Sequence, residues 1–284
     1  MNIEKVIQGV RNSLTVLLVL LLALLSNFFL VSHLISGVAQ NNLRLAFQAQ
    51  IAAATAPTSE LTFQKKQVAT GAPIAIIEIP SLGISQVVVE GTDSATLRTG
   101  VGHRRDTVLP GQEGMTVLMG KRWSYGAPFA SLPSIKEGAE IITYTGQGKS
   151  TYVVERVRRA GDIGLGPTTK GQNQLVLTTV EGSYFVPSQI VRVDAKLTSQ
   201  AFPSGLRVTQ WGNIPAEERE LGIDLRFLWQ LAFALQFLIL VEIGLIWSRR
   251  RFGLAKTWLV FGPLMTMALV VTTDQITRIL PNLM

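Results

Sequence analysis

Three long apolar segments constrain most strongly what this chain can fold into. They are Leu14–Val38, Phe227–Trp247 and Thr257–Thr273, and a more polar middle region separates the first from the second. An α-helix rises about 1.5 Å per residue, so roughly 20 apolar residues cross the hydrocarbon core of a bilayer. The third segment is shorter and contains Pro263. We expect three transmembrane α-helices that contact membrane lipid, with the middle region folded in water.

The positions of the cations predict the orientation. Lys5 and Arg11 precede the first segment, and Arg249–Arg251 lie in the short connection 248–256 between the second and the third. Short cytoplasmic loops are enriched in Lys and Arg. Both basic stretches are therefore expected in the cytoplasm, which places the middle region on the extracellular side of a multi-pass cell-membrane protein. A cleaved signal peptide is the open alternative for the first segment, because residues 37–39 (Gly-Val-Ala) are small.

The composition along the chain predicts five parts. They are a cytoplasmic segment with the first transmembrane helix (1–39), an extracellular stalk or linker (40–72), a β-rich domain (73–199), a second linker (200–224) and a C-terminal transmembrane helical hairpin (225–284). Leu43, Phe47 and Ile51 recur at helical spacing, so we expect the stalk to begin as a helix.

The chain has no cysteine, two histidines and a formal net charge of +7. Without cysteine, no disulfide can stabilise the extracellular domain, and no thiolate can act as a nucleophile. The basic loop explains part of the charge, and aromatic and basic residues do not interleave in a way that indicates nucleic acid. Only His103 lies in the water-exposed region, so we expect no metal site there and no cofactor.

The middle region is predicted to consist of short β-strands. The expected strands are Ile74–Ile79, Ile84–Val89, Met115–Met119, Glu140–Thr145, Ser150–Val157, Leu175–Thr179 and Gln189–Leu197. Their apolar and β-branched residues are bounded by Gly and Pro turns, as is typical of strands. Many short strands at close spacing favour a closed or nearly closed barrel, so the predicted fold class of this domain is mainly β.

The stretch Leu97–Arg122, LRTGVGHRRDTVLPGQEGMTVLMGKR, carries a specific resemblance. It resembles the sortase family, cysteine transpeptidases of Gram-positive cell surfaces, in which a Gly-x-Gly-His run, a Pro-Gly turn and an apolar strand ending in Gly-His-Arg follow in this order. Ile79–Ile84 resembles the family's Ile-Pro-x-Leu-Gly-Ile turn. The similarity covers about residues 73–199 and implies a closed barrel of about eight strands. His103 matches a non-catalytic family histidine, which we interpret as structural.

The resemblance also implies where catalytic residues would stand. Sortases use a Cys nucleophile, a His and an Arg, and those positions are occupied here by Val180, Lys121 and Ile190. A valine side chain has no lone pair, and an unperturbed lysine is a poor proton shuttle near neutral pH. Arg192 lies two residues beyond Ile190 on the same strand face, so it is a possible substitute. The predicted class is therefore a pseudosortase, which is not an enzyme.

The sequence leaves two functions to compare, and a third in which the C-terminal helical hairpin is the functional part and the barrel is an external sensor. The first is a catalytically inactive sortase-like membrane protein that acts as a cell-surface binding or scaffolding subunit for another surface or membrane protein. The alternative is an active transpeptidase or hydrolase of altered chemistry, in which Thr or Lys replaces Cys and His. Thr178, Thr179 and Ser183 are the nearby hydroxyls, and Lys121 would serve as a base if burial depressed its pKa.

Several charged and aromatic side chains are expected to ring the cleft. The candidate cleft-rim binding residues are Lys121, Arg122, Tyr125, Glu181, Tyr184 and Arg192. Because a lone ammonium group is costly to bury, we expect Lys121 at the rim, held by Glu181 or by water. Glu242 is the candidate for an intramembrane contact, since a carboxylate within an apolar span commonly faces a partner.

Overall fold

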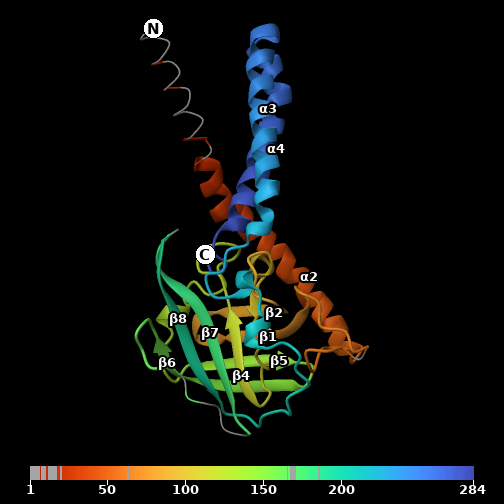
Figure 1. Ribbon diagram of the computed structural model, residues 1–284, viewed down its shortest axis with the longest axis vertical. Helices are drawn as coiled ribbons and strands as arrows, with labels where there is room; N and C mark the ends of the chain where they lie inside the picture. Colours follow the sequence, from red (N-terminus) through yellow and green to blue (C-terminus); the bar gives the residue numbers. More distant parts are fainter. Residues whose placement is uncertain are drawn as a thin grey trace. The chain divides into compact units, whose positions relative to one another are not determined.

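Eight β-strands close into a barrel in the computed structural model (Figure 1). The strands are β1 (Pro73–Ile79), β2 (Ile84–Glu90), β3 (Val101–His103), β4 (Gly114–Met119), β5 (Glu140–Thr145), β6 (Gly148–Arg158), β7 (Asn173–Ser183) and β8 (Val186–Leu197). Their order around the barrel is β1-β2-β3-β4-β7-β8-β6-β5, with β5 pairing back onto β1. The predicted closed barrel of about eight strands is confirmed. The structure describes residues 7, 11, 18, 19, 21–62, 64–164, 166, 171–184 and 186–284.

The first two strands show how the sequence specifies the barrel. Ala75, Ile77 and Ile79 of β1 are buried and alternate with the half-buried Ile76 and Glu78, whereas β2 ends in a run of buried residues, Val87–Glu90. Between them, Pro80–Leu82 (η2) forms a single 3-10 turn that ends on Gly83, whose φ of 66° is left-handed. Glycine adopts this conformation without a Cβ clash, so the two strands return antiparallel.

The barrel encloses an apolar core to which nearly every strand contributes. Its fully buried members include Ile74, Ile77, Ile79, Val88, Val101, Leu118, Ile141, Tyr152, Leu175, Leu177, Val193 and Ala195. Phe129 and Leu132 join this core from the long connection between β4 and β5. The domain contains no cysteine, so burial of these apolar side chains replaces disulfide stabilisation.

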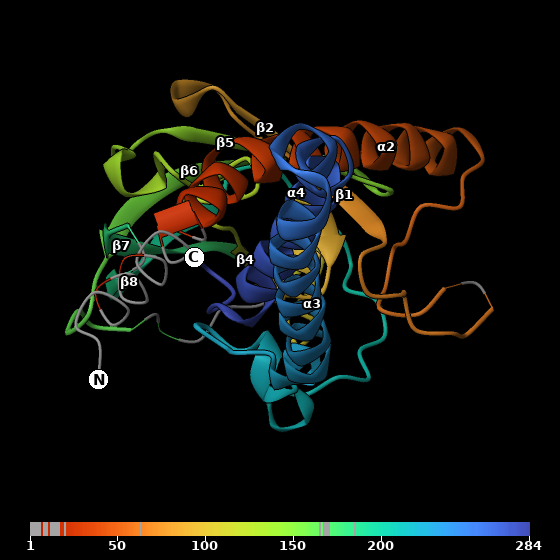
Figure 2. The same cartoon turned by 90° about the horizontal axis from the view of Figure 1, so that it is seen from above.

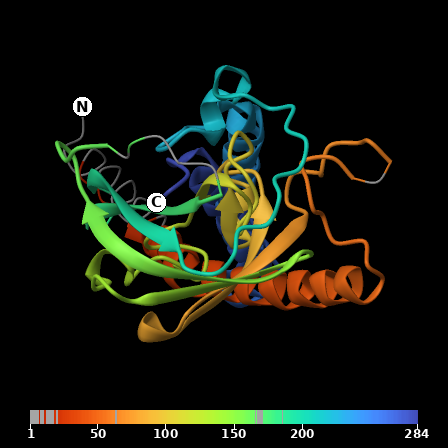
Figure 3. The same cartoon turned by 90° about the horizontal axis from the view of Figure 1, so that it is seen from below.

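The segments on either side of the barrel are packed onto it. Helix α2 (Ser32–Ala52) lies beside β1 and β2 (Figure 3), where the Gln40 side chain accepts a hydrogen bond from Val87 N at 2.7 Å. Glu60 holds the later segment, because its carboxylate accepts hydrogen bonds from the backbone N–H groups of Val208 and Thr209. Residues 32–223 and 281–284 form one compact unit, so both predicted linkers are largely ordered parts of the barrel domain.

The other compact unit comprises Met1–Val31 and Asp224–Leu280. Its helices α3 (Leu228–Phe252) and α4 (Leu254–Ile279) run side by side as a hairpin (Figure 2). They meet through Leu238, Val241 and Ala268, and the turn between them is Gly253 alone. The loop expected at 248–256 is therefore mostly helical. A short 3-10 turn, Leu225–Phe227 (η7), leads into α3.

The structure contains two helical stretches that are long and apolar enough to cross a membrane, Leu225–Phe252 and Leu254–Ile279. Among the described residues the number of candidate spans is two, not the predicted three. The first predicted span, Leu14–Val38, lies partly outside the described residues. Its described part is helical from residue 21 and includes a π-helix, Asn27–Val31 (η1), where the regular hydrogen-bond ladder is interrupted.

Candidate functional site

The strand β4 delivers Lys121 into the interior of the domain. The strand ends at Met119, and Gly120 follows with its N–H donating to Thr178 O at 3.1 Å on β7. A Cβ on Gly120 would lie 2.5 Å from the ring of Phe129, so only glycine lets the backbone pass this close. The next side chain, Lys121, is 1% exposed. The expectation that Lys121 lies at an exposed cleft rim is therefore wrong.

Burial changes the chemistry of the Lys121 amine. Desolvation, assisted by the positive charge of Arg98, lowers the pKa of Lys121 from 10.5 to about 7, and Asp93 opposes this shift. A buried ammonium loses its hydration and has to lose its proton or find a partner. The amine donates to the backbone oxygen of Met284 at 3.1 Å. The partner is thus a backbone oxygen, whereas the sequence suggested the carboxylate of Glu181.

Ser124 directs a second donor at the same oxygen. Its hydroxyl donates to Met284 O at 2.7 Å, and the side chain is 1% exposed. The backbone N–H of Arg122 donates to Leu283 O at 3.0 Å. Residues 121–124 therefore donate three hydrogen bonds to the backbone oxygens of two successive residues, 283 and 284. We call this group of donors, with the Tyr125 ring beside it, the Lys121 pocket.

The loop after Lys121 is held in a strained conformation. Tyr125 and Ala127 have φ values of 51° and 43°, in the left-handed region that non-glycine residues rarely adopt. The Tyr125 N–H donates to the hydroxyl of Ser32 at 3.2 Å, and Ala127 N–H donates to Ser124 O at 2.9 Å. These bonds fix the loop and with it the hydroxyl of Ser124. Backbone strain of this kind tends to gather at binding sites.

Two cations lie close to the buried ring of Tyr125. The guanidinium of Arg98 lies 4.6 Å from the ring centroid, and the Lys121 amine lies 5.8 Å from it. The face of an aromatic ring attracts cations, which offsets part of the repulsion between these two positive charges. The pocket is therefore electropositive and suits an oxygen that carries negative charge.

Val180 and Ile190, which the resemblance to sortases puts at the nucleophile and arginine positions, face each other across the β7–β8 ladder. Val180 is fully buried. The sequence predicted that β7 ends at Thr179 and that β8 begins at Gln189. In the structure the ladder continues almost to the turn, with a bulge at Glu181 and Gly182.

The remaining predicted rim residues are partnered on the barrel surface. Glu181 binds Arg159 at 2.9 Å, which is the largest cause of the lowered pKa of the Glu181 carboxyl. Arg192 forms a bidentate pair with Glu220. Tyr184 is exposed and stacks at 6.1 Å from Trp123. Of the predicted rim residues, only Lys121, Arg122 and Tyr125 are brought together in one pocket, to which the structure adds Ser124 and Arg98.

The other sequence candidates take structural positions. Thr179 donates to Gly120 O at 3.0 Å, and Thr178 is buried beside it on β7. His103 links β3 to Glu90 of β2 at 2.9 Å and to Val108 O at 3.0 Å, in agreement with the structural role predicted for it. Glu242 is half-buried on α3, and its intramembrane contact stays a prediction. Within the described residues, no three His, Asp or Glu side chains gather as a metal site would require.

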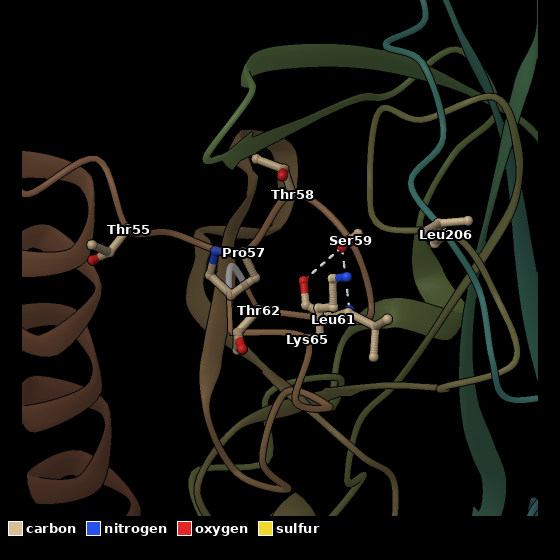
Figure 4. A pocket seen from close by; sticks show the side chains of 8 residues that line it. All are labelled: Thr55, Pro57, Thr58, Ser59, Leu61, Thr62, Lys65 and Leu206. Atoms are coloured by element: carbon tan, nitrogen blue, oxygen red, sulfur yellow. Dashed lines mark hydrogen bonds between the residues drawn. The ribbon is translucent and has the colours of Figure 1, made fainter.

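A separate cavity of about 240 Å³ lies away from these residues (Figure 4). It is lined by Thr55, Pro57, Thr58, Ser59, Leu61, Thr62, Lys65 and Leu206. Ser59 Oγ donates to Leu61 O at 2.6 Å, which closes the loop at this cavity. None of its lining residues belongs to the predicted site or to the Lys121 pocket, so the pocket beside Lys121 is the candidate functional site.

The barrel region also matches known proteins. Residues 77–197 match the sortase domain family. The chain is 30% identical over 112 residues to sortase D of Bacillus subtilis (strain 168), a match that covers 39% of this chain and 55% of that protein. The chain thus spans about half the length of this curated relative.

Solved sortase structures are also among the matches to this chain. A sortase D5 transpeptidase of Clostridium perfringens is 18% identical with a TM-score of 0.48, and the match covers 57% of this chain and 99% of that chain. Sortase E of Streptomyces avermitilis is 29% identical with a TM-score of 0.40, covering 53% of this chain and 99% of that chain. The sortase match therefore concerns the barrel, residues 77–197, which is less than half of the chain.

The prediction that the chain is not an enzyme is wrong. The sortase domain and the similarity to sortase D point to an enzyme. The prediction depended on two substitutions, Lys121 and Val180, and treated the lysine as an ordinary surface cation. Buried, with a pKa of about 7, the Lys121 amine is chemically different from the lysine that the sequence suggested.

Proposed function

We propose that this sortase domain, held at the cell membrane with its barrel outside the cell, binds a peptide segment of another surface or membrane protein in the Lys121 pocket. One observation carries the proposal. The Lys121 amine and the Ser124 hydroxyl, both buried, donate to a single backbone oxygen at 3.1 and 2.7 Å. Such a pair of donors is suited to a main-chain carbonyl oxygen, which every peptide contains whatever its sequence.

The neighbouring donor favours a peptide over an isolated anion. The Arg122 N–H donates to the backbone oxygen of Leu283, the residue before Met284. The pocket therefore binds the backbone oxygens of two successive residues. A buried donor left without an acceptor costs about 1–3 kcal/mol. The donors of this pocket therefore favour an occupied state, and the chemistry of the occupant is that of an extended main chain.

A second candidate function is acyl transfer with Lys121 as the proton acceptor. It is favoured by the pKa of about 7, which leaves a large fraction of the amine neutral at neutral pH, and by the sortase family membership. In this candidate, the Ser124 oxygen attacks a peptide carbonyl carbon and its proton passes to Lys121. The C–N bond breaks, the leaving amine takes that proton, and the acyl group on Ser124 is then transferred to water or to another amine.

The binding proposal is tested with an immobilised random pentapeptide library and the whole chain in detergent. Wild type and the variant Asn282→Ala are both screened, because Asn282 belongs to the segment 281–284, whose backbone oxygens occupy these donors. We expect a set of peptides whose retention falls at least tenfold with Lys121→Met or Ser124→Ala. Lys136→Met removes an exposed lysine and is the matched control. Equal retention by Lys121→Met and the control, or no retention by any variant, would overturn the proposal.

A further inference from the structure

The residues that occupy the Lys121 pocket are the chain's own segment Pro281–Met284, which we call the tail. Asn282 and Leu283 are 0% exposed and Met284 is 3% exposed. The tail belongs to the same compact unit as the barrel, although helix α4, which precedes it in the chain, does not. The tail therefore shows how the pocket holds a short peptide.

Asn282 makes the most specific contacts. Its side-chain amide donates to Thr92 O and to Arg219 O, each at 2.8 Å, and more weakly to Glu217 O at 3.3 Å. Its backbone N–H donates to Gly222 O at 3.0 Å. The side chain thus enters a ring of backbone carbonyls, all of which are acceptors.

A ring of carbonyl oxygens selects strongly among side chains. The primary amide of Asn offers two N–H donors on a short neutral side chain. An aspartate in its place would direct a carboxylate at the same carbonyls, and an alanine would leave them without donors in a buried place. We call the carbonyls of Thr92, Glu217 and Arg219 the Asn site.

The next two residues are held differently. Leu283 is buried as an apolar side chain while its backbone oxygen accepts from Arg122 N–H. Met284 presents its backbone oxygen to Lys121 and Ser124. One residue is therefore recognised by its side-chain amide, the next by its apolar side chain and backbone, and the third by its backbone oxygen.

The loop that carries two carbonyls of the Asn site, those of Glu217 and Arg219, is under backbone strain. It comprises the 3-10 turn Ala216–Glu218 (η6) and the residues up to Gly222, and Leu221 adopts a left-handed φ of 59°. Thr92 clamps it by donating from its hydroxyl to Glu218 O at 2.6 Å. A non-glycine residue in this conformation persists only where surrounding contacts require it. Here those contacts include Asn282.

We propose that the Lys121 pocket and the Asn site form one peptide site that reads the order Asn, apolar residue, backbone oxygen, and that the tail is its resident, exchangeable ligand. This inference rests on the proposed peptide binding and names its ligand class. A peptide from another protein has to displace the tail first. The apparent affinity of the wild-type site is then its intrinsic affinity multiplied by the fraction of molecules in which the tail is undocked.

The test uses fluorescein-labelled Pro-Asn-Leu-Met, made as the acid and as the amide, of which the tighter binder is taken forward. Fluorescence anisotropy measures its binding to the whole chain in detergent. Asn282→Ala should bind this peptide at least tenfold more tightly than wild type does. The peptide Pro-Ala-Leu-Met should bind Asn282→Ala at least tenfold more weakly than Pro-Asn-Leu-Met. Asn213→Ala changes an exposed asparagine and should behave as wild type.

Hydrogen exchange at the Arg122, Asn282 and Met284 amides reports whether the tail is released, because Arg122 N–H donates to Leu283 O and Asn282 N–H donates to Gly222 O. If Asn282→Ala leaves it docked, deletion of residues 281–284 is used in its place. A chain with a released tail that binds neither peptide, or binds both equally, overturns the inference. The proposed function fails separately, since it requires Lys121-dependent retention of some library peptide regardless of an Asn preference.

Discussion

The ε-amino group of Lys121 lies 3.1 Å from the backbone oxygen of Met284, a residue 163 positions further along the chain. The acceptor is part of the main chain, so it satisfies the amine without a side-chain carboxylate. Low solvation is therefore the main influence on the amine, and the pKa of Lys121 falls to about 7. This one contact connects the loop after β4 with the segment 281–284.

The first prediction concerns stability and pH. The pKa of Lys121 is about 7 in the folded chain against 10.5 for an unperturbed lysine, so the unfolded state holds more protons between these values. Stability therefore rises as the pH increases from about 7 towards 10.5, and the burial penalty is fully present below pH 7. Lys121→Met should raise the free energy of unfolding at pH 6 by on the order of a few kcal/mol, and the thermal midpoint rises with it. At pH 9.5 both increases should be much smaller.

Thermal unfolding of wild type and of Lys121→Met at pH 6 and pH 9.5 measures this effect, with Lys136→Met as the exposed control. The control should change stability equally at both pH values. A Lys121→Met variant with the same shift at both pH values would show that the amine keeps an ordinary pKa.

The barrel could be predicted from sequence because its signals are local. Short runs rich in apolar and β-branched residues define β1 and β2, and the turn at Gly83 requires a left-handed residue. The β7–β8 ladder was predicted too short. Glu181 and Gly182 look like a loop in sequence, but the bulge at these residues lets pairing continue.

The candidate site was only partly predictable, for a physical reason. Lys121 was identified by its place after β4, yet its burial depends on residues that arrive from distant parts of the chain. Ser124 carries no motif, and its role follows only from sharing an acceptor with Lys121. The signal that was available is the Asn282-Leu283-Met284 ending, whose polar residue follows an apolar helix, but nothing local indicates where it docks.

The second prediction concerns the backbone beside Lys121. Gly120→Ala places a Cβ 2.5 Å from the ring of Phe129, which is itself fully buried in the core. The ring has no free space to move into, so we expect destabilisation of about 1–3 kcal/mol. Urea unfolding measures it. Gly164→Ala is the control, because nothing lies within 4 Å of its Cβ position. Equal midpoints for the two variants would contradict the packing argument.

The third prediction concerns Glu60, which holds residues 208 and 209 to the segment before β1. Burial raises the pKa of its carboxyl, but hydrogen bonds from Thr209, Val208 and Gln67 outweigh this and lower the pKa below 4.5. A lowered folded pKa means stability that is present above pH 4.5 and is lost as the pH falls through the folded value. Glu60→Gln should be less stable than wild type at pH 7, by about 1–2 kcal/mol, and the difference should shrink by pH 3.

Thermal unfolding at pH 7 and pH 3 checks the Glu60 prediction. Exposed Glu137→Gln serves as the matched control and should show no comparable pH-dependent difference. A Glu60→Gln deficit that persists unchanged at pH 3 would mean that the carboxylate charge is not what holds the segment.

The fourth prediction concerns sidedness. The chain has no cysteine, so single cysteines can be placed without background. Arg251→Cys, next to the Gly253 turn, should be protected from a membrane-impermeant thiol reagent in intact cells, because short basic loops stay in the cytoplasm. Gln147→Cys and Gly171→Cys on the barrel domain should be labelled. Labelling in the opposite sense would place the barrel in the cytoplasm.

The last prediction tests the acyl-transfer candidate through the pH dependence of turnover. A neutral Lys121 amine is required to accept the Ser124 proton, so the rate on a fluorescence-quenched Leu-Pro-x-Thr-Gly-type peptide should rise as the pH increases through about 7. The whole chain with Asn282→Ala is used, so that the tail does not compete. Lys121→Met should abolish turnover, and Ser124→Ala should lower it at least 100-fold if its oxygen is the nucleophile, whereas Lys136→Met should leave the profile unchanged.

A loss of only about 10-fold with Ser124→Ala would assign it the role of a hydrogen-bond donor to the substrate oxygen. Absence of turnover between pH 5 and pH 9, in a chain that still binds library peptides through Lys121, would eliminate acyl transfer on this peptide and leave peptide binding as the function of the pocket.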